Sequence, residues 1–169
     1  MNTSQKEQSK DESSYSTRYL SFSLGTEEYA IPLLSVKEVI AIPDVTPVPF
    51  TPNYFQGIMN LRGQVISIID LRKKLGVTAK TESETAVIIC DLNPLCLGIV
   101  VDSVNYVLSL RPQDIAAKPD IQSSRNTDYI TGVYRKDKKL ILLLDIFHTL
   151  SADDRTAAAK AVVKDAKAA

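Results

Sequence analysis

The chain is built mainly from short runs in which apolar and polar residues alternate, the pattern of β-strands with one buried face. In residues 18–24, for example, Leu20, Phe22 and Leu24 fall on one face and polar or amphipathic residues fall on the other. Similar apolar or alternating runs follow at residues 27–31, 65–69, 85–90, 95–101, 104–110 and 140–144. Residues 33–41 fit either a helical turn or a further strand, and four prolines between positions 43 and 52 predict an extended connection in which a helix could not persist.

One stretch, residues 57–75, reads as strand, tight turn, strand and short helix, and it occurs twice along the chain. The apolar positions of the two copies stay in step without a gap, and so do an aromatic residue, a glycine and an aspartate: Tyr54 with Tyr129, Gly57 with Gly132 and Asp70 with Asp145. Internal similarity of this kind is the mark of a duplicated structural unit. A weaker match with a slightly shorter offset precedes it and relates Ile31, Val36 and Val39 to Ile99, Val104 and Val107.

These patterns predict an all-β protein of two small, five-stranded barrels packed side by side, with short helices and a helical tail. Neither barrel could bury much apolar surface alone, so the interface between them should supply much of the stability. The predicted organisation is a disordered tail at residues 1–17, the paired barrels at residues 18–150 and an Ala- and Lys-rich tail at residues 151–169. In that tail Ser151 and Asp154 have the spacing of a capping box, which predicts a marginal surface helix with a frayed end.

Composition narrows the functional classes. Twenty basic and twenty acidic side chains cancel, and there is no Trp, which disfavours nucleic-acid or oligosaccharide binding as the main role. Cys90 and Cys96 lie in apolar runs, as expected for reduced thiols in a cytosolic protein. No segment has the form of a signal peptide, and the longest apolar run is too short to span a bilayer.

The search for catalytic groups finds no set of residues suited to an enzyme. The single His148 lies on a predicted short helix without a nucleophile beside it, the glycine-containing turn lacks a phosphate-loop ending, and no ligand cluster has metal-site spacing. Asp70, Asp102 and Asp145 each follow a β run, where helix capping and strand ends explain them best. We therefore expect no catalysis, no cofactor and no metal.

The two repeats differ at the turn between their strands. The second copy has Lys136, Asp137, Lys138 and Lys139, an ordinary solvated turn, whereas the first has Leu61, Arg62, Gly63 and Gln64. Arg is well suited to interfaces, because it is weakly hydrated and carries a rigid fork of donors. The first turn is therefore either a docking point or a locally bonded structural turn. Val36 and Val39, on either side of Glu38, equally fit a core or an apolar groove with a charged rim.

The stretch Gly-Ile-Met-Asn-Leu-Arg-Gly at residues 57–63 and the Val-Ile-Ser-Ile-Ile-Asp-Leu-Arg that begins at Val65 resemble the signature of the CheW family, coupling proteins of bacterial chemotaxis. The segments at residues 27–31, 98–102 and 107–110 resemble it as well, so the similarity covers residues 18–150. The resemblance implies two SH3-like barrels without catalytic activity. It also implies a cytoplasmic adaptor, recruited to the inner face of the membrane, that bridges methyl-accepting chemoreceptors and the regulatory domain of the histidine kinase CheA.

The resemblance also implies roles for residues of this chain. The receptor tip would contact Val36, Glu38, Arg62 and Val107, supported at the turn by Gly57, Asn60, Leu61 and Gly63. The kinase would contact Val45 in the proline-rich connection, and residues 118–121, with Asp120 and Ile121, would make secondary contacts in a signalling array. The competing hypothesis is a small-ligand sensor or an enzyme that uses the cleft between the barrels; converging carboxylates in an apolar pocket would favour it.

Overall fold

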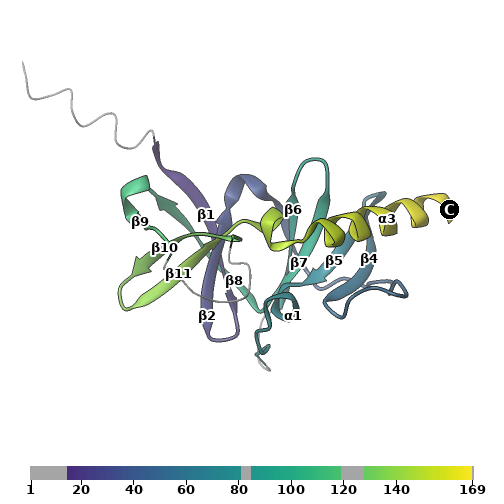
Figure 1. Ribbon diagram of the computed structural model, residues 1–169, viewed down its shortest axis with the longest axis horizontal. Coiled ribbons are helices and arrows are strands. Elements are labelled where there is room, and N and C mark those ends of the chain that lie inside the picture. Colours follow the sequence, from purple (N-terminus) through teal and green to yellow (C-terminus); the bar gives the residue numbers. More distant parts are fainter. Residues whose placement is uncertain (1–14, 81–84, 119–127, 169) are drawn as a thin grey trace, which may run out of the picture.

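The computed structural model describes residues 15–80, 85–118 and 128–168, which form two β-sheets side by side with a helix across one of them (Figure 1). The first sheet is ordered β3-β6-β7-β5-β4, from β3 (Val36–Ala41), β4 (Phe55–Leu61), β5 (Gln64–Asp70), β6 (Ala86–Asp91) and β7 (Cys96–Val101). The second is ordered β8-β1-β2-β11-β10-β9, from β1 (Thr17–Leu24), β2 (Glu27–Pro32), β8 (Ser103–Leu110), β9 (Ile115–Ala116), β10 (Ile130–Lys136) and β11 (Lys139–Leu144). We call these sheets the first and second barrel. The prediction of two five-stranded units is confirmed, and the two-residue β9 adds a sixth strand to the second.

The short helices lie at the ends of strands. The helical turn η2 (Leu33–Ser35) leads into β3, and η3 (Pro112–Asp114) leads into β9. Helix α1 (Leu71–Leu75) follows β5, α2 (Ile146–Thr149) follows β11, and α3 (Ala152–Ala168) ends the described chain. The ambiguous segment at residues 33–41 thus contains both candidates, a helical turn followed by a strand.

The barrels exchange one strand each. β3 comes directly after β2 of the second barrel but pairs with β6 of the first, and β8 comes directly after β7 of the first barrel but pairs with β1 of the second. The weaker sequence match reflects this exchange, because it relates β2 and β3 to β7 and β8. The two barrels therefore cannot be separated by a single cut in the chain.

The repeat of residues 57–75 is confirmed in detail. β4 pairs with β5 and β10 pairs with β11, and each hairpin has a register shift just before its glycine, Gly57 or Gly132. The backbone N–H of Asp70 donates to the carbonyl of Tyr54 at 2.7 Å, and that of Asp145 donates to Tyr129 at 2.8 Å. Both aspartates cap the helix that follows, as predicted, since their carboxylates accept backbone N–H groups of α1 and α2.

The largest buried cluster joins the two barrels. It packs Phe22, Leu24 and Ile31 of the second barrel against Ile69, Leu97 and other apolar residues of the first. Each barrel also has one smaller buried cluster of its own. The cluster of the first barrel surrounds Ile66, Ile68 and Ile89, and that of the second surrounds Ala30, Ile141 and Leu143. Burial of apolar surface is the main favourable term in folding, so the shared cluster makes the paired barrels one structural unit, as expected.

Helix α3 is more firmly attached than the marginal surface helix that the sequence predicted. It runs along the first barrel (Figure 1), where Ala158 is fully buried and its carbonyl accepts a hydrogen bond of 3.0 Å from Ser67 Oγ in β5. The capping box of Ser151 and Asp154 is present in both directions, at 3.0 and 3.1 Å. The Asp154 carboxylate also accepts from the hydroxyl of Tyr54 and from Lys74 Nζ. These contacts fix the helix against the first barrel, which its Ala-rich composition could not reveal.

Candidate functional site

The turn between β4 and β5 presents an arginine that is held in place by a glutamate of another strand of the same sheet. Arg62 Nη1 lies 2.7 Å from Glu38 Oε1, and Arg62 Nη2 lies 2.9 Å from Glu38 Oε2, a bidentate ion pair. The Arg62 side chain is 73% exposed, against 24% for Glu38. The hydrogen bonds from the guanidinium lower the pKa of Glu38. The guanidinium is thus oriented by the fold while most of its surface faces solvent.

Backbone geometry explains why this turn has its sequence. Arg62 and Gly63 have φ of 52° and 85°, the two left-handed positions of a tight hairpin turn. Asn60 Oδ1 accepts the N–H of Gly63 at 2.8 Å, which closes the turn from inside. Leu61 is half-buried against the interior cluster of the first barrel. The backbone and the Asn60 side chain therefore shape the turn, whereas the Arg62 side chain extends from it toward solvent.

The glycine at position 57 is required for a separate structural reason. Its φ is 137°, and a Cβ there would lie 2.1 Å from the carbonyl oxygen of Thr46. Thr46 and Ile58 bond to each other through both backbone groups, at 2.8 and 2.9 Å. Only glycine allows the proline-rich connection to lie this close to β4.

Of the other two predicted receptor contacts, one lies near the ion pair and the other lies on the second barrel. Val36 lies on β3, the strand of Glu38, and is half-buried against the shared core. Val107 lies on β8 of the second barrel, pairs with Leu20 and is 50% exposed. The structure therefore brings Glu38 and Arg62 into direct contact, with Val36 two residues along the strand, and places Val107 on the other sheet.

The predicted kinase contact Val45 is half-buried against the interior cluster of the first barrel, so much of its surface is used within the molecule. More exposed apolar residues flank it in the proline-rich connection: Ile42 is 52% exposed and Phe50 is fully exposed. The predicted array contacts Asp120 and Ile121 lie outside the described residues.

The second barrel has a corresponding contact with different chemistry. The offset that relates Val36 to Val104 also relates Glu38 to Tyr106, and Lys136 at the β10–β11 turn places its Nζ 3.6 Å from the centre of the Tyr106 ring. Each barrel thus has a polar contact from its exchanged strand to a hairpin turn, an ion pair in the first and a cation–π contact in the second. The correspondence of Glu38 with Tyr106 was not predicted, although the weaker sequence match already related the two strands that carry them.

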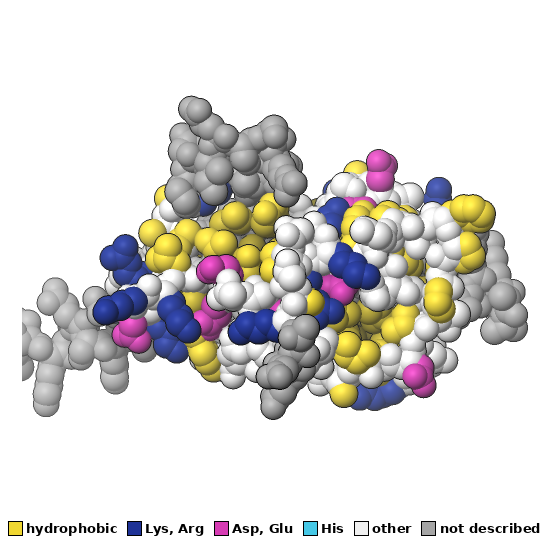
Figure 2. Space-filling view, turned by 90° about the horizontal axis from the view of Figure 1, so that it is seen from below, with side chains coloured by type: hydrophobic (Ala, Val, Ile, Leu, Met, Phe, Trp, Pro, Cys, Tyr) yellow, Lys and Arg dark blue, Asp and Glu magenta, His cyan; other side chains and the backbone are white. Residues whose placement is uncertain are grey.

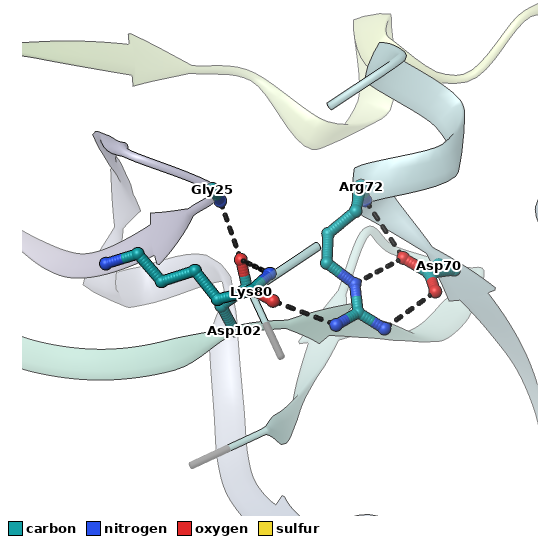
Figure 3. A network of polar contacts seen from close by, with 5 residues as sticks. All are labelled: Gly25, Asp70, Arg72, Lys80 and Asp102. Atoms are coloured by element: carbon teal, nitrogen blue, oxygen red, sulfur yellow. Dashed lines mark hydrogen bonds and ion pairs between the residues drawn. The ribbon is translucent and has the colours of Figure 1, made fainter. Parts of the chain in front are cut away.

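A buried ionic network connects the two barrels and was also missed (Figure 3). Arg72, the second residue of α1, donates from Nε and Nη2 to the carboxylate of Asp70 at 3.0 and 2.9 Å, and from Nη1 to Asp102 at 2.8 Å. Asp102 is fully buried and also accepts the N–H of Gly25, in the β1–β2 turn, at 2.6 Å. Burial would raise the pKa of Asp102, but the hydrogen bond from Arg72 and those from backbone N–H groups outweigh it and lower the pKa. Asp70, Asp102 and Asp145 are therefore structural, as predicted, and Asp102 anchors one barrel to the other.

A small cavity lies where the barrels meet. It has a volume of about 140 Å³ and is lined by apolar side chains together with Ser35, Thr131 and Asp145. Asp145 contributes the only carboxylate of this lining, and its Oδ2 lies 2.8 Å from His148 Nδ1. The converging carboxylates that would favour a sensor or an enzyme are therefore not found in this cavity.

Cys90 and Cys96 are free thiols, and burial raises the pKa of Cys90 to about 12. Among residues 15–80, 85–118 and 128–168, no group of three or more His, Cys, Asp or Glu side chains could hold a metal ion. In the same ranges no helix is both long and apolar enough to cross a bilayer. Figure 2 shows one face of the molecule, on which hydrophobic patches over both halves are interrupted by side chains of both charges.

The chain is similar in sequence and in fold to known proteins. Residues 18–154 match the family model described as the CheW-like domain. The chain is 37% identical over 137 residues to a chemotaxis protein CheW of Klebsiella aerogenes, covering 80% of this chain and 82% of that protein. It is 31% identical over 140 residues to a chemotaxis protein CheW of Treponema pallidum, with the same two coverages. The crystal structure of the scaffolding protein TtCheW from Thermoanaerobacter tengcongensis superposes with a TM-score of 0.74 at 28% identity, covering 82% of this chain and 90% of that one.

Proposed function

The chain belongs to the CheW-like domain family, and on that premise we propose that it is an adaptor that couples transmembrane chemoreceptors to the histidine kinase CheA in chemotaxis signalling arrays. The family is one of chemotaxis scaffolding proteins rather than of enzymes. The adaptor acts in the cytoplasm and is recruited to the inner face of the membrane through the receptors that it binds.

The observation that carries this proposal is the pre-oriented guanidinium of Arg62. Ordering a long side chain on binding costs conformational entropy, and a side chain already held in one geometry avoids most of that cost. Glu38 accepts from two of the five N–H donors of Arg62, so the remaining donors and the planar face are left for a partner. An exposed arginine with a fixed orientation is a typical interface anchor.

The receptor's helical tip meets this anchor as a helix in a groove, a common mode of recognition that uses apolar contacts and a charged rim. Val36 and Val107 supply apolar contacts, and Arg62 and Glu38 supply the charged rim. Val36 belongs to the shared core as well, so its contact surface is backed by rigid packing. The turn residues Gly57, Asn60, Leu61 and Gly63 hold the anchor in position.

The kinase binds another face of the first barrel, along the proline-rich connection that contains Val45. The backbone bonds between Thr46 and Ile58 tie this connection to β4. A partner can therefore bind it without first ordering a loop. Asp120 and Ile121 contribute secondary contacts in the array.

The test is a ternary binding experiment. A receptor-tip fragment and the regulatory domain of CheA should each bind the full chain, and both should sediment with it in one complex. Glu38→Lys should abolish receptor binding and leave kinase binding unchanged, because it places a like charge against Arg62 on the receptor face only. Failure of the wild-type chain to bind either partner would refute the adaptor role.

A further inference from the structure

The cavity at the junction of the barrels lies where the second repeat would carry its counterpart of the buried ionic network. β11 pairs with β2 in the same register as β5 pairs with β7. Leu142 lies opposite Tyr29 in the one pair. The corresponding Ser67 lies opposite Leu97 in the other. Both pairs of strands therefore end at equivalent corners of the molecule, each beside the aspartate that caps the next helix.

The corner of the first repeat is filled by a guanidinium group. Arg72 donates from two of its nitrogens to Asp70 and from a third to the buried Asp102. The offset of the weaker sequence match relates Asp102 to Leu34, whose side chain is 95% exposed. The second carboxylate of the network thus has no counterpart at the corner of the second repeat.

The second repeat keeps the first carboxylate but replaces the cation. The backbone angles φ and ψ are −108° and 110° at Asp145, close to the −83° and 104° of Asp70. The residue at the position of Arg72 is Phe147, whose ring is 40% exposed. That ring packs on the guanidinium of α3, since Arg155 Cζ lies 3.9 Å from the ring centre. The side chain that would fill the corner is therefore used elsewhere.

The corner of the second repeat contains the cavity of about 140 Å³. Its apolar walls come from both barrels, with Leu92 after β6 in the first and Ile31 and Leu144 in the second. An apolar cavity of about 150 Å³ accommodates a benzene molecule. The half-buried Asp145 and the exposed Thr131 also line the cavity, so solvent reaches it from this side.

The polar part of the lining suits a cation. None of the described residues that line the cavity is basic, and Ser35 and Thr131 add hydroxyl oxygens to the Asp145 carboxylate. Asp145 Oδ2 lies 2.8 Å from His148 Nδ1, but a carboxylate has about four lone-pair sites, so acceptors remain for a ligand. A planar amidinium or guanidinium pairs with a carboxylate through two parallel N–H bonds, as Arg72 does in the first repeat.

We propose that this cavity binds a small organic cation, an amidinium or guanidinium that carries an apolar group of about the size of a benzene ring. The apolar group enters the cavity, and the charged group pairs with Asp145, in the place that corresponds to the guanidinium of Arg72. Because Leu92 and Ile31 belong to different barrels, the bound cation contacts both. This inference does not depend on the receptor or the kinase.

The test is an NMR titration of the full chain with benzamidine, and the matched control is benzamide, which has nearly the same shape and no charge. Benzamidine should shift the backbone amides of Ile31, Leu92 and Leu144 in a saturable way. Benzamide should bind at least about tenfold more weakly, because it cannot form the charge-assisted pair. Asp145→Asn retains a residue suited to cap α2 and should bind benzamidine no better than benzamide.

A second variant transfers the cation of the first repeat to the second. Phe147→Arg changes an exposed residue and should place a guanidinium against Asp145, so the fold should persist and benzamidine binding should be lost. Phe147→Ala adds no cation and should bind benzamidine like the wild type. Any of three results would overturn the proposal: equal binding of benzamide and benzamidine, undiminished binding by Asp145→Asn or Phe147→Arg, or shifts scattered over the surface without saturation.

Discussion

The two repeats of the strand–turn–strand–helix unit have the same backbone but different surroundings and different chemistry. In the first copy, Arg72 of α1 joins the buried carboxylates of Asp70 and Asp102. The corresponding residue of the second copy is Phe147, which is 40% exposed and lies against Arg155 of α3. The first copy is thus fixed to the second barrel by charges and covered by a helix, whereas the second copy is the more open of the two.

This comparison indicates that the residues shared by the two copies determine the backbone conformation, whereas the residues that differ determine what each copy does. In both copies the glycine lies next to the register shift of the hairpin, the aspartate caps the helix, and the backbone carbonyl of the tyrosine accepts the N–H of that aspartate. Arg72 and Arg62 occur only in the first copy, where one connects the barrels and the other faces solvent. Substitutions at paired positions should therefore have unequal effects.

The largest difference in lost folding free energy is expected between Arg72→Ala and Phe147→Ala. Removal of the Arg72 guanidinium leaves two buried carboxylates without their cation, a change that typically costs about 3–5 kcal/mol of folding free energy. Phe147→Ala removes a partly exposed ring and its contact with Arg155, worth about 1 kcal/mol. Urea denaturation of the two variants measures both losses. A loss for Arg72→Ala no larger than that for Phe147→Ala would show that the network does not hold the barrels together.

Substitution of the two repeat glycines should also cost unequal amounts of folding free energy, with a smaller difference. At Gly57 an alanine would meet the carbonyl oxygen of Thr46 at 2.1 Å in a backbone conformation that only glycine adopts readily, and we expect a loss of about 2–4 kcal/mol. At Gly132 the nearest atom is Ile115 Cγ2, at 2.5 Å, on a side chain of the two-residue strand β9 that can shift. We expect about 1 kcal/mol for Gly132→Ala, from the same denaturation experiment. Equal losses would mean that the register shift itself, and not the proline-rich connection, requires the glycine.

Helix α3 packs along the first copy and touches the second only near its start, through Arg155 and Phe147, and its attachment should depend on Asp154. Burial alone would raise the pKa of this carboxyl group, but the Lys74 ammonium and the Tyr54 hydroxyl outweigh it and hold the pKa at about 2. Because this folded-state value lies below the ordinary value of 3.8, the stabilisation is complete near neutral pH and is lost as the pH falls from about 4 through about 2.

Asp154→Ala should release the helix at neutral pH, at a cost of about 1–2 kcal/mol for the lost cap and buried bonds. Hydrogen exchange at the backbone amides of residues 152–160 measures the release. The matched control is Asp153→Ala, which changes an exposed carboxylate one residue earlier and should leave exchange unchanged. Equal protection in both variants would show that Ala158 and Ser67, not Asp154, attach the helix.

Much of this fold is readable in the sequence because its signals are local. Alternating runs mark the strands, and the repeated glycine and aspartate mark the hairpins and the helix caps. The weaker match between residues 31–39 and 99–107 also contains the strand exchange, although which strand joins which barrel depends on long-range pairing that periodicity does not encode.

The features that could not be predicted from the sequence depend on contacts between residues far apart in the chain. Arg72 looks like any basic residue on a short helix until Asp102, 30 positions away, is placed beside it. Helix α3 looks like a solvated Ala- and Lys-rich segment until Asp154 meets Tyr54, 100 positions away. Arg62 was identified as unusual from the turn alone, but its partner Glu38 was associated with it only through the family resemblance.

The smallest effect on folding and the sharpest effect on binding are expected at the paired turns. Arg62 and Asp137 occupy corresponding positions with φ of 52° and 55°, and asparagine is suited to both. Arg62→Asn and Asp137→Asn should therefore both leave the unfolding midpoint unchanged, because each changes an exposed side chain without disturbing its turn. Only Arg62→Asn should weaken binding of a receptor-tip fragment, by about tenfold or more, since it removes the oriented guanidinium. Isothermal titration calorimetry of the two variants decides the matter: an equal affinity would assign Arg62 to the fold alone, and a loss in both would place the second turn in the receptor interface as well.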